Sequence, residues 1–334
     1  MIIEATNKLL DGVELSFIEI REIFDEILSG LADEVVAASF LTALKSQQNI
    51  LDAQLAAILS SQETIKKHSF GFENSIQNIS LSENNSYIDV LIAQDIICAA
   101  NGLGVSRFSF DNGFKPYSFK VLSSFGLNIK EIEKLDELLV EQCGLAYFYL
   151  SSKLPYYKYT QKLKNNLPFD NIFNTTSKML NIIGSRDLFI AIQDKEKIDE
   201  FANLALKLGY ENSVVLSNGS DFSMLSLEGD TVVAEAWKNK IFTYVLNAEL
   251  LGLKSTSLDE LKCESIEQNK SELLEIMQGK LKNAKYDVIV LNSALALYIS
   301  KKADSIMDGI DLAKKTIDTG LMLEKFEHIK KCYQ

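Results

Sequence analysis

Residues 76–128 predict a strand, a loop and an apolar helix, followed by a second strand and helix: IQNISLSENNSYIDVLIAQDIICAANGLGVSRFSFDNGFKPYSFKVLSSFGLN. Three further runs of β-branched or aromatic residues follow, each before an amphipathic or turn-rich stretch: LAYFYL (145–150), DLFIAI (187–192) and NSVVLSN (212–218). Strands that alternate with helices indicate β-α-β units and a mainly parallel sheet.

The loop between the first strand and its helix contains no glycine, since residues 81–85 are LSENN. Backbone N–H groups can wrap around a phosphate only where residues adopt positive φ and allow close approach, which glycine does most easily. The sequence of this segment therefore predicts its fold, but it does not support a phosphate-binding role for the loop.

The remainder of the chain predicts two domains. Residues 1–70 form an N-terminal helical domain, with a capping box at Ser16-Phe17-Ile18-Glu19 and a helix capped by Asp52. Residues 153–182 are expected to pack on it. Residues 71–334 form the α/β domain, in which a turn at Glu228-Gly229-Asp230 introduces antiparallel strands at one edge.

Composition excludes several classes of protein. The formal net charge is −12 over 334 residues, so bulk binding to nucleic acid or to an anionic membrane is disfavoured. The N-terminus lacks the features of a signal peptide and no apolar run approaches membrane-spanning length, which predicts a cytoplasmic protein. Four scattered cysteines and two histidines indicate neither a zinc site nor a disulfide framework.

Four separate segments together resemble one family: ILSG with AASFLTAL (27–44), IFN (172–174), NSALAL (292–297) and DGIDLAKKTIDTG (308–320). The chain resembles the anthranilate phosphoribosyltransferases, which share their fold with the pyrimidine nucleoside phosphorylases. The resemblance implies a small α domain, a larger α/β domain, a cleft between them and a homodimer formed through the α domains. It also implies transfer of a phosphoribosyl group from phosphoribosyl pyrophosphate to anthranilate, with Mg²⁺, as in tryptophan biosynthesis.

The phosphate motifs of that family are degraded in this chain. The GTGGD loop falls near residues 79–83 and retains only the acidic Glu83, and the NxST motif falls on 89–92, where apolar side chains replace the hydroxyls. The KHGNR segment falls on 106–110 and retains one cation, Arg107. In the serine-rich turn that follows, Lys115 and Ser118 could still contact an anion.

The acceptor and metal motifs are reduced as well. The arginine that meets the anthranilate carboxylate appears as Lys164, which lacks the planar fork of a guanidinium. The Asp-Glu pair that holds magnesium appears as Asp221-Phe222, so one carboxylate remains. The candidate ligands for substrate and phosphate are Glu83, Arg107, Lys115, Ser118 and Lys164, and the candidate metal ligand is Asp221.

Three hypotheses follow. The first is a protein of this fold that has lost most of the parent activity and binds a partner or a small anionic ligand in a regulatory role. The second is an active phosphoribosyl or glycosyl transferase that uses Glu83, Asp221, Lys115 and Lys164 in a rebuilt site with Mg²⁺. The third is nucleic-acid binding through the basic and aromatic stretch 153–164, against which the net charge argues. The sequence favours the first and does not decide whether the protein is an enzyme.

Overall fold

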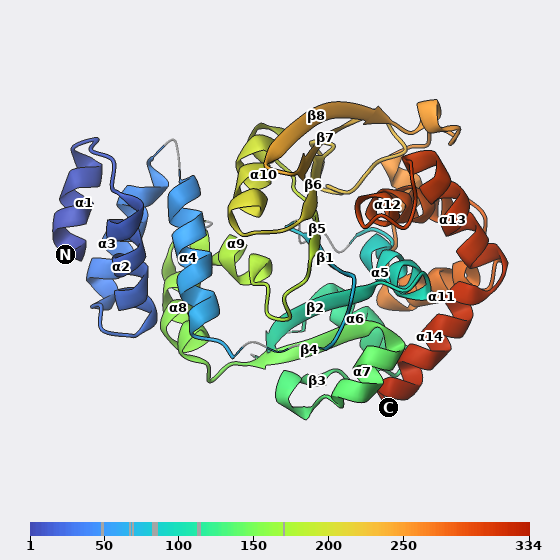
Figure 1. Ribbon diagram of the computed structural model, residues 1–334, viewed down its shortest axis with the longest axis horizontal. Coiled ribbons are helices and arrows are strands. Elements are labelled where there is room, and N and C mark those ends of the chain that lie inside the picture. Colours follow the sequence, from blue (N-terminus) through green and yellow to red (C-terminus); the bar gives the residue numbers. More distant parts are fainter. Residues whose placement is uncertain (48–49, 67, 69, 82–85, 112–114, 170) are drawn as a thin grey trace. The chain divides into compact units, whose positions relative to one another are not determined.

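The computed structural model describes residues 1–334 except 48–49, 67, 69, 82–85, 112–114 and 170 (Figure 1). The chain divides into two compact units. The helical unit comprises residues 1–68 and 150–184, and the α/β unit comprises residues 69–149 and 185–334.

The helical unit is built from α1 (Ile2–Leu10), α2 (Phe17–Leu28), α3 (Glu34–Lys45), α4 (Leu51–Glu63), α8 (Pro155–Asn166) and α9 (Ile172–Met179). The capping box at Ser16 is present, because its side chain accepts from Glu19 N–H while the Glu19 carboxylate accepts from Ser16 N–H. Phe24, fully buried on α2, packs edge-to-face against Phe40 and Phe173. Aromatic packing thus joins α2, α3 and α9.

Two details of the helical unit differ from the sequence prediction. Helix α1 precedes the capping box at Ser16, in a stretch for which the sequence analysis delimits no helix. The expected cap Asp52 is wrong: Ile50 is the N-cap of α4, and Asp52 lies in the first turn. A carboxylate is favourable at either position because both lie at the positive end of the helix dipole, so sequence does not separate them.

The strands of the α/β unit are β1 (Ser75–Ser80), β2 (Gly104–Asp111), β3 (Lys130–Glu131), β4 (Leu145–Ser151), β5 (Asp187–Ala191), β6 (Asn212–Ser217), β7 (Asp230–Trp237) and β8 (Lys240–Asn247). They form one sheet in the order β3-β4-β2-β1-β5-β6-β7-β8. β1 pairs in parallel with β2 and β5, and β5 with β6, whereas β7 and β8 are antiparallel. The expectation of a small helical unit and a mainly parallel sheet is confirmed.

The hairpin at the antiparallel edge turns at a different place from the one predicted. Its two-residue loop is Lys238-Asn239, with φ of 48° and 59°, between the paired residues Trp237 and Lys240. The predicted turn at 228–230 instead leads into β7. Two-residue hairpin loops need positive φ at both central positions, which asparagine tolerates well, and Asn239 was the overlooked signal.

The helices of this unit are α5 (Val90–Ala100), α6 (Tyr117–Ser124), α7 (Glu137–Cys143), α10 (Ile198–Lys207), α11 (Ile266–Met277), α12 (Ala284–Ile299), α13 (Ile306–Asp318) and α14 (Leu321–Cys332). Figure 1 shows α5, α12 and α13 on one side of the sheet and α10 on the other. A Cβ built on Gly309 of α13 would lie 2.5 Å from the carbonyl oxygen of Ala294, so glycine is required for α13 to approach α12 this closely. The core of the unit lies around α12.

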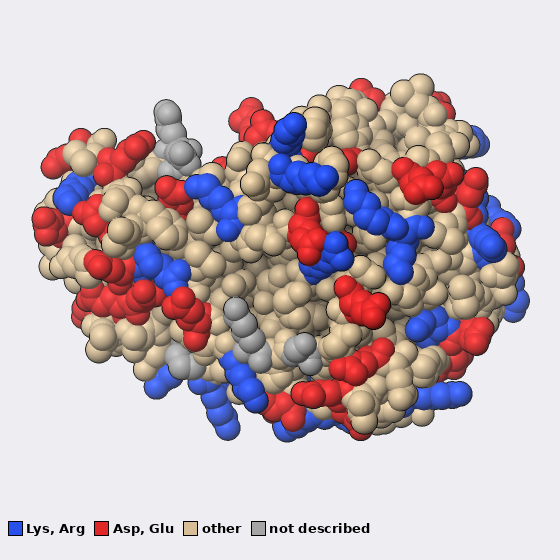
Figure 2. All heavy atoms as spheres, in the orientation of Figure 1, with Lys and Arg blue, Asp and Glu red and all other residues tan. Residues whose placement is uncertain are grey.

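Basic and acidic side chains are interspersed over the face drawn in Figure 2, and among the described residues no broad basic area is visible there. None of the described helices is both long enough and apolar enough to span a bilayer.

Candidate functional site

The candidate site lies in the α/β unit, where β1, β2 and β6 end. In open sheets with parallel strands, ligands bind outside the carboxyl ends of the strands. Arg107, Ser118 and Asp221 lie in this unit, and Lys164 lies in the helical unit. Glu83 falls outside the described residues. Lys115 is described and exposed.

The N-terminus of α5 follows the loop after β1 and is capped by a carboxylate. Asp89 is the N-cap, and its Oδ1 accepts from Ile92 N–H at 3.1 Å. The first helical residues are Val90 and Ile92, both buried, with Leu91 between them. A helix N-terminus attracts an anion through its free N–H groups and its dipole. In this chain the anion present at that position is the protein's own carboxylate.

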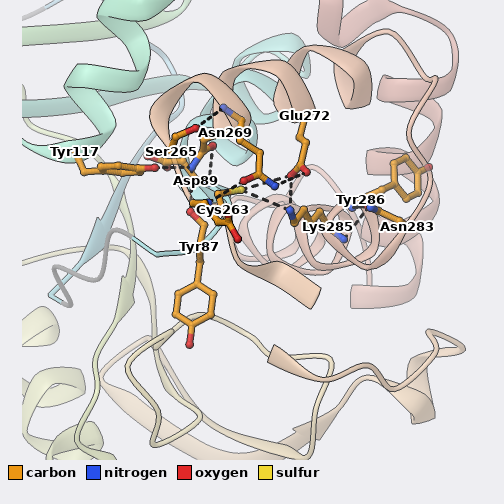
Figure 3. A network of polar contacts seen from close by, with 12 residues as sticks. Tyr87, Asp89, Tyr117, Cys263, Ser265, Asn269, Glu272, Asn283, Lys285 and Tyr286 are labelled. Carbon is orange, nitrogen blue, oxygen red and sulfur yellow. Dashed lines mark hydrogen bonds and ion pairs between the residues drawn. The ribbon is translucent and has the colours of Figure 1, made fainter. Parts of the chain in front are cut away.

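A buried asparagine holds the segment that leads into α5. Asn269, on α11 and fully buried, donates to the Tyr87 carbonyl at 3.0 Å and to the Tyr117 hydroxyl at 3.3 Å. Its Oδ1 accepts from Asp89 N–H at 3.1 Å, so it lies between three elements (Figure 3). The sequence analysis missed Asn269. Its signal was a polar residue on the same helical face as Ile266 and Leu273.

The backbone next to this asparagine adds two further links. Ile88 N–H donates to the Leu261 carbonyl and Cys263 N–H donates to the Ser86 carbonyl, each at 2.8 Å. Residues 86–88 are therefore tied to residues 261–263 along a short antiparallel bridge. This fixes the path of the chain on one side of the glycine-free loop.

Asp221 is exposed in the loop after β6, and its carboxylate accepts a hydrogen bond from a tyrosine. The Tyr87 hydroxyl donates to Asp221 Oδ1 at 2.9 Å. Burial, reinforced by this bond to a carboxylate, raises the pKa of Tyr87 to about 12. The neighbouring Phe222 is buried and packs edge-to-face on the Tyr87 ring, with centroids 5.1 Å apart. The residue that follows Asp221 thus contributes an apolar ring and no second carboxylate.

A magnesium ion at Asp221 would take most of its oxygen ligands from water and from a phosphorylated ligand. Mg²⁺ requires near-octahedral oxygen coordination, usually with one or two carboxylates plus waters and substrate phosphates. Within the described part of the chain, no three His, Cys, Asp or Glu side chains come together as a metal-binding group. Asp221 is the one predicted metal ligand, and its Oδ1 already accepts a hydrogen bond.

Arg107 and Ser118, both predicted to contact substrate or phosphate, lie close together. The Arg107 guanidinium, however, forms an ion pair with the buried carboxyl group of Asp95. Arg107 Nη1 lies 3.5 Å from Ser118 Oγ, and Nη2 lies 2.6 Å from Asp95 Oδ2. The Arg107 side chain is 12% exposed and that of Asp95 is 0% exposed. Most of the positive charge of this residue is therefore compensated inside the protein.

Asp95 is the centre of a polar network that spans three strands and α5. It accepts from Asn78 Nδ2 at 2.8 Å and from the Tyr147 hydroxyl at 2.9 Å, in addition to its ion pair with Arg107. Burial raises the pKa of Asp95 to about 6, and the Arg107 charge opposes this rise. The sequence analysis did not identify this network, because Asp95 lies within a mostly apolar helix.

The lysines of α8 contact other groups of the helical unit. Lys164 Nζ lies 3.4 Å from Ser177 Oγ, and Lys162 Nζ forms an ion pair with Glu34 at 2.8 Å. Lys158 Nζ lies 5.3 Å from the centroid of the Tyr159 ring. These contacts are those of a solvated helix face and do not assemble an anion site by themselves.

A third buried cluster joins α11 to the start of α12. Lys285 pairs with Glu272, and its Nζ lies 3.6 Å from Cys263 Sγ (Figure 3). Burial raises the pKa of Cys263 to about 12, so the thiol is protonated at neutral pH. The cluster satisfies a buried ammonium group and anchors the two helices.

Comparison with known proteins covers both parts of the chain. Residues 3–53 match the family model described as "Glycosyl transferase family, helical bundle domain", and residues 85–323 match "Glycosyl transferase family, a/b domain". The anthranilate phosphoribosyltransferase of Lacticaseibacillus paracasei is 26% identical over 98% of this chain and 96% of its own. That of Acetivibrio thermocellus is 27% identical over 98% of this chain and 95% of its own.

Solved structures show the same fold. The anthranilate phosphoribosyltransferase of Thermus thermophilus superimposes with a TM-score of 0.87 at 20% identity, over 98% of this chain and 99% of its own. The enzyme of Saccharomyces cerevisiae, in complex with PRPP and Mg, superimposes with a TM-score of 0.85 at 18% identity, over 99% of this chain and 97% of its own. The chain therefore belongs to the glycosyl transferase family of these two models and, over nearly its full length, is similar to the anthranilate phosphoribosyltransferases.

Proposed function

We propose that this chain is a non-catalytic member of the anthranilate phosphoribosyltransferase group, which uses the fold in a binding or regulatory role. The observation that carries the proposal is the carboxylate of Asp89 at the N-terminus of α5, 3.1 Å from the N–H of Ile92. A ligand phosphate at this helix end would compete with that carboxylate for the same N–H groups.

Charge supports the proposal. Two like unit charges 4 Å apart repel by about 4 kcal/mol at an effective dielectric constant of 20. A pyrophosphate would meet Asp89 at the helix terminus, while the nearby Arg107 is already paired with Asp95. Phosphoribosyl transfer depends on preorganised positive charge and hydrogen-bond donors around the leaving group. The described residues supply little of either at this edge of the sheet.

The active alternative has one observation in its favour. Asp221 and Lys115 are exposed at the ends of the loops after β6 and β2, so a ligand phosphate and Mg²⁺ could reach them. A lone carboxylate holds Mg²⁺ only when phosphate oxygens and water complete the shell. This alternative predicts that binding of Mg²⁺ depends strictly on the phosphorylated ligand.

We further infer a homodimer through the helical unit, as the family resemblance suggests. Exposed apolar side chains support it: Ile3 on α1, Ile18 on α2 and Val35 on α3 are 64%, 69% and 73% exposed. Apolar groups left exposed on neighbouring helices are typical of a protein-protein contact. Nucleic-acid binding through α8 is disfavoured by the net charge of −12.

Isothermal titration with phosphoribosyl pyrophosphate and Mg²⁺, followed by anthranilate, tests the proposal. We expect no binding heat and no product by the unaltered protein. Asp89→Ser keeps a good N-cap and removes the charge, so we expect it to give measurable binding heat with phosphoribosyl pyrophosphate at a concentration where the parent gives none. Micromolar binding by the unaltered protein that is lost in Asp221→Ala, together with product formation, would overturn the proposal in favour of the active alternative.

A further inference from the structure

Strand β8 is an edge strand without the usual protection against association. It pairs with β7 over its whole length, from Lys240 opposite Trp237 to Asn247 opposite Asp230. Figure 1 shows it as the outermost strand of the sheet, and no other strand in the described part of the chain pairs with it. Natural sheets protect such edges with charges, prolines, bulges or short strands. Residues 241–247, IFTYVLN, contain no charge, proline or glycine.

The side chains of this edge are partly apolar and exposed. Phe242 is 54% exposed and Val245 is 56% exposed, on opposite faces of the strand. Beyond the ladder to β7, the backbone of residues 240–247 makes no hydrogen bond to another residue that the structure describes. The outer N–H and C=O groups are therefore available to a further strand.

We propose that β8 pairs antiparallel with β8 of a second copy of this chain, around a two-fold axis at Tyr244. This register places Phe242 beside Leu246 of the second copy and Thr243 beside its Val245. It also places Lys240 opposite Ala248 of the second copy, one residue from the exposed Glu249. Lys240 and Glu249 make no ion pair with other described residues, so each end of the pairing would gain one between opposite charges.

Charge complementarity favours a second copy and registers that bring Lys240 close to Glu249. A two-fold axis at Thr243 would place Lys240 opposite Leu246, away from Glu249. The uncharged stretch between the two ends avoids repulsion between chains that each carry a net charge of −12. This surface is separate from the helices of the dimer inferred above, and the two contacts are tested independently.

Sedimentation velocity of the full chain tests the β8 contact. Phe242→Lys places a charge on the exposed edge, and we expect it to reduce the weight-average mass at least twofold. Leu138→Lys is the matched control, because Leu138 is 70% exposed on α7 of the same unit. It should leave the mass unchanged. A parent that is monomeric at all concentrations, or a mass that Phe242→Lys leaves unchanged while Val35→Lys halves it, would overturn the proposal.

A cross-linking experiment tests the register. Residues on the two-fold axis of an antiparallel pair lie about 4.5–5.5 Å apart at Cα, which suits a disulfide. We expect Tyr244→Cys to form an intermolecular disulfide under mild oxidation, whereas Leu138→Cys does not. Cross-linking at equal rates in both variants, or in neither while association persists, would contradict this register.

Discussion

The centre of α12 and the middle of β2 both contain a fully or largely buried polar group, and the two differ in what that group contacts. Asn292 on α12 bonds to backbone atoms: it accepts from Leu225 N–H at 2.9 Å and donates to the Leu225 carbonyl at 3.0 Å. Arg107 in the middle of β2 contacts the side chain of Asp95 instead.

This difference explains why the sequence predicts the fold of this protein well and its reaction poorly. A buried group that bonds to backbone atoms holds two elements together and has a structural role independent of any ligand. A charged group in a strand can instead serve a ligand or another side chain. In this chain Arg107 and Asp221 both contact other side chains of the protein, Asp95 and Tyr87.

The largest expected effect concerns the buried ion pair between β2 and α5. Asp95→Ala leaves the Arg107 guanidinium buried without its partner, and removing one member of a buried pair costs about 3–5 kcal/mol. Urea unfolding followed by circular dichroism measures this loss. Asp311→Ala, at an exposed position on α13, should change the free energy of unfolding by less than about 0.5 kcal/mol. A loss below about 1 kcal/mol in Asp95→Ala would show that the pair is not important for stability.

The pH dependence of the same group is the next largest effect. The folded-state pKa of Asp95, about 6, lies above its ordinary value of 3.8, so the folded protein binds this proton more tightly than the unfolded chain. Its contribution is present in full below about pH 4 and is lost as the pH rises through about 6, a change of about 3 kcal/mol. Urea unfolding at about pH 4.5 and about pH 7 should show this term in the parent. Asp95→Asn, which does not titrate, should lack it, and an identical pH dependence in both proteins would contradict the assignment.

A smaller effect is expected at the scaffold position. Asn292→Ala removes the hydrogen bonds to Leu225 and leaves buried backbone groups unpaired, at a cost of about 2 kcal/mol. The lower thermal midpoint should be accompanied by unchanged ligand titrations. Asn203→Ala, at an exposed asparagine of α10, is the control for the chemical change. Altered binding of phosphoribosyl pyrophosphate in Asn292→Ala would mean that the scaffold and the site are not separable.

The smallest effect on stability is expected for Tyr87, which donates a hydrogen bond to Asp221. Tyr87→Phe keeps the ring contact with Phe222 and removes one hydrogen bond, which should cost about 1 kcal/mol. Because the substitution removes this hydrogen bond from Asp221, titration with Mg²⁺ and phosphoribosyl pyrophosphate should detect any ligand binding that the bond suppresses. The double variant Tyr87→Phe/Asp221→Ala is the control. If Tyr87→Phe binds and the double variant does not, the tyrosine suppresses a ligand site.

Local patterns were enough to predict much of the architecture. The alternation of β-branched runs with amphipathic helices predicted a mainly parallel sheet, and the capping box at Ser16 marked the start of α2. The absence of glycine from the loop at residues 81–85 was also a local observation, although residues 82–85 lie outside the described part of the chain. The hairpin turn was placed wrongly, since both 228–230 and 238–239 contain turn-forming residues and strand pairing chose between them.

The candidate site depended on contacts that no local pattern encodes. Tyr87 and Asp221 are 134 residues apart, and Asn269 is 180 residues from Asp89. Sequence identified Arg107 as a candidate cation, and the structure places it in the middle of β2, but whether that cation serves a ligand or a buried acid is set by the packing of α5 against the sheet. Composition and periodicity act over one turn or one strand and so specify the elements of this protein. The partners of its charged groups follow from burial, because a buried charge must find a counter-charge wherever the fold provides one.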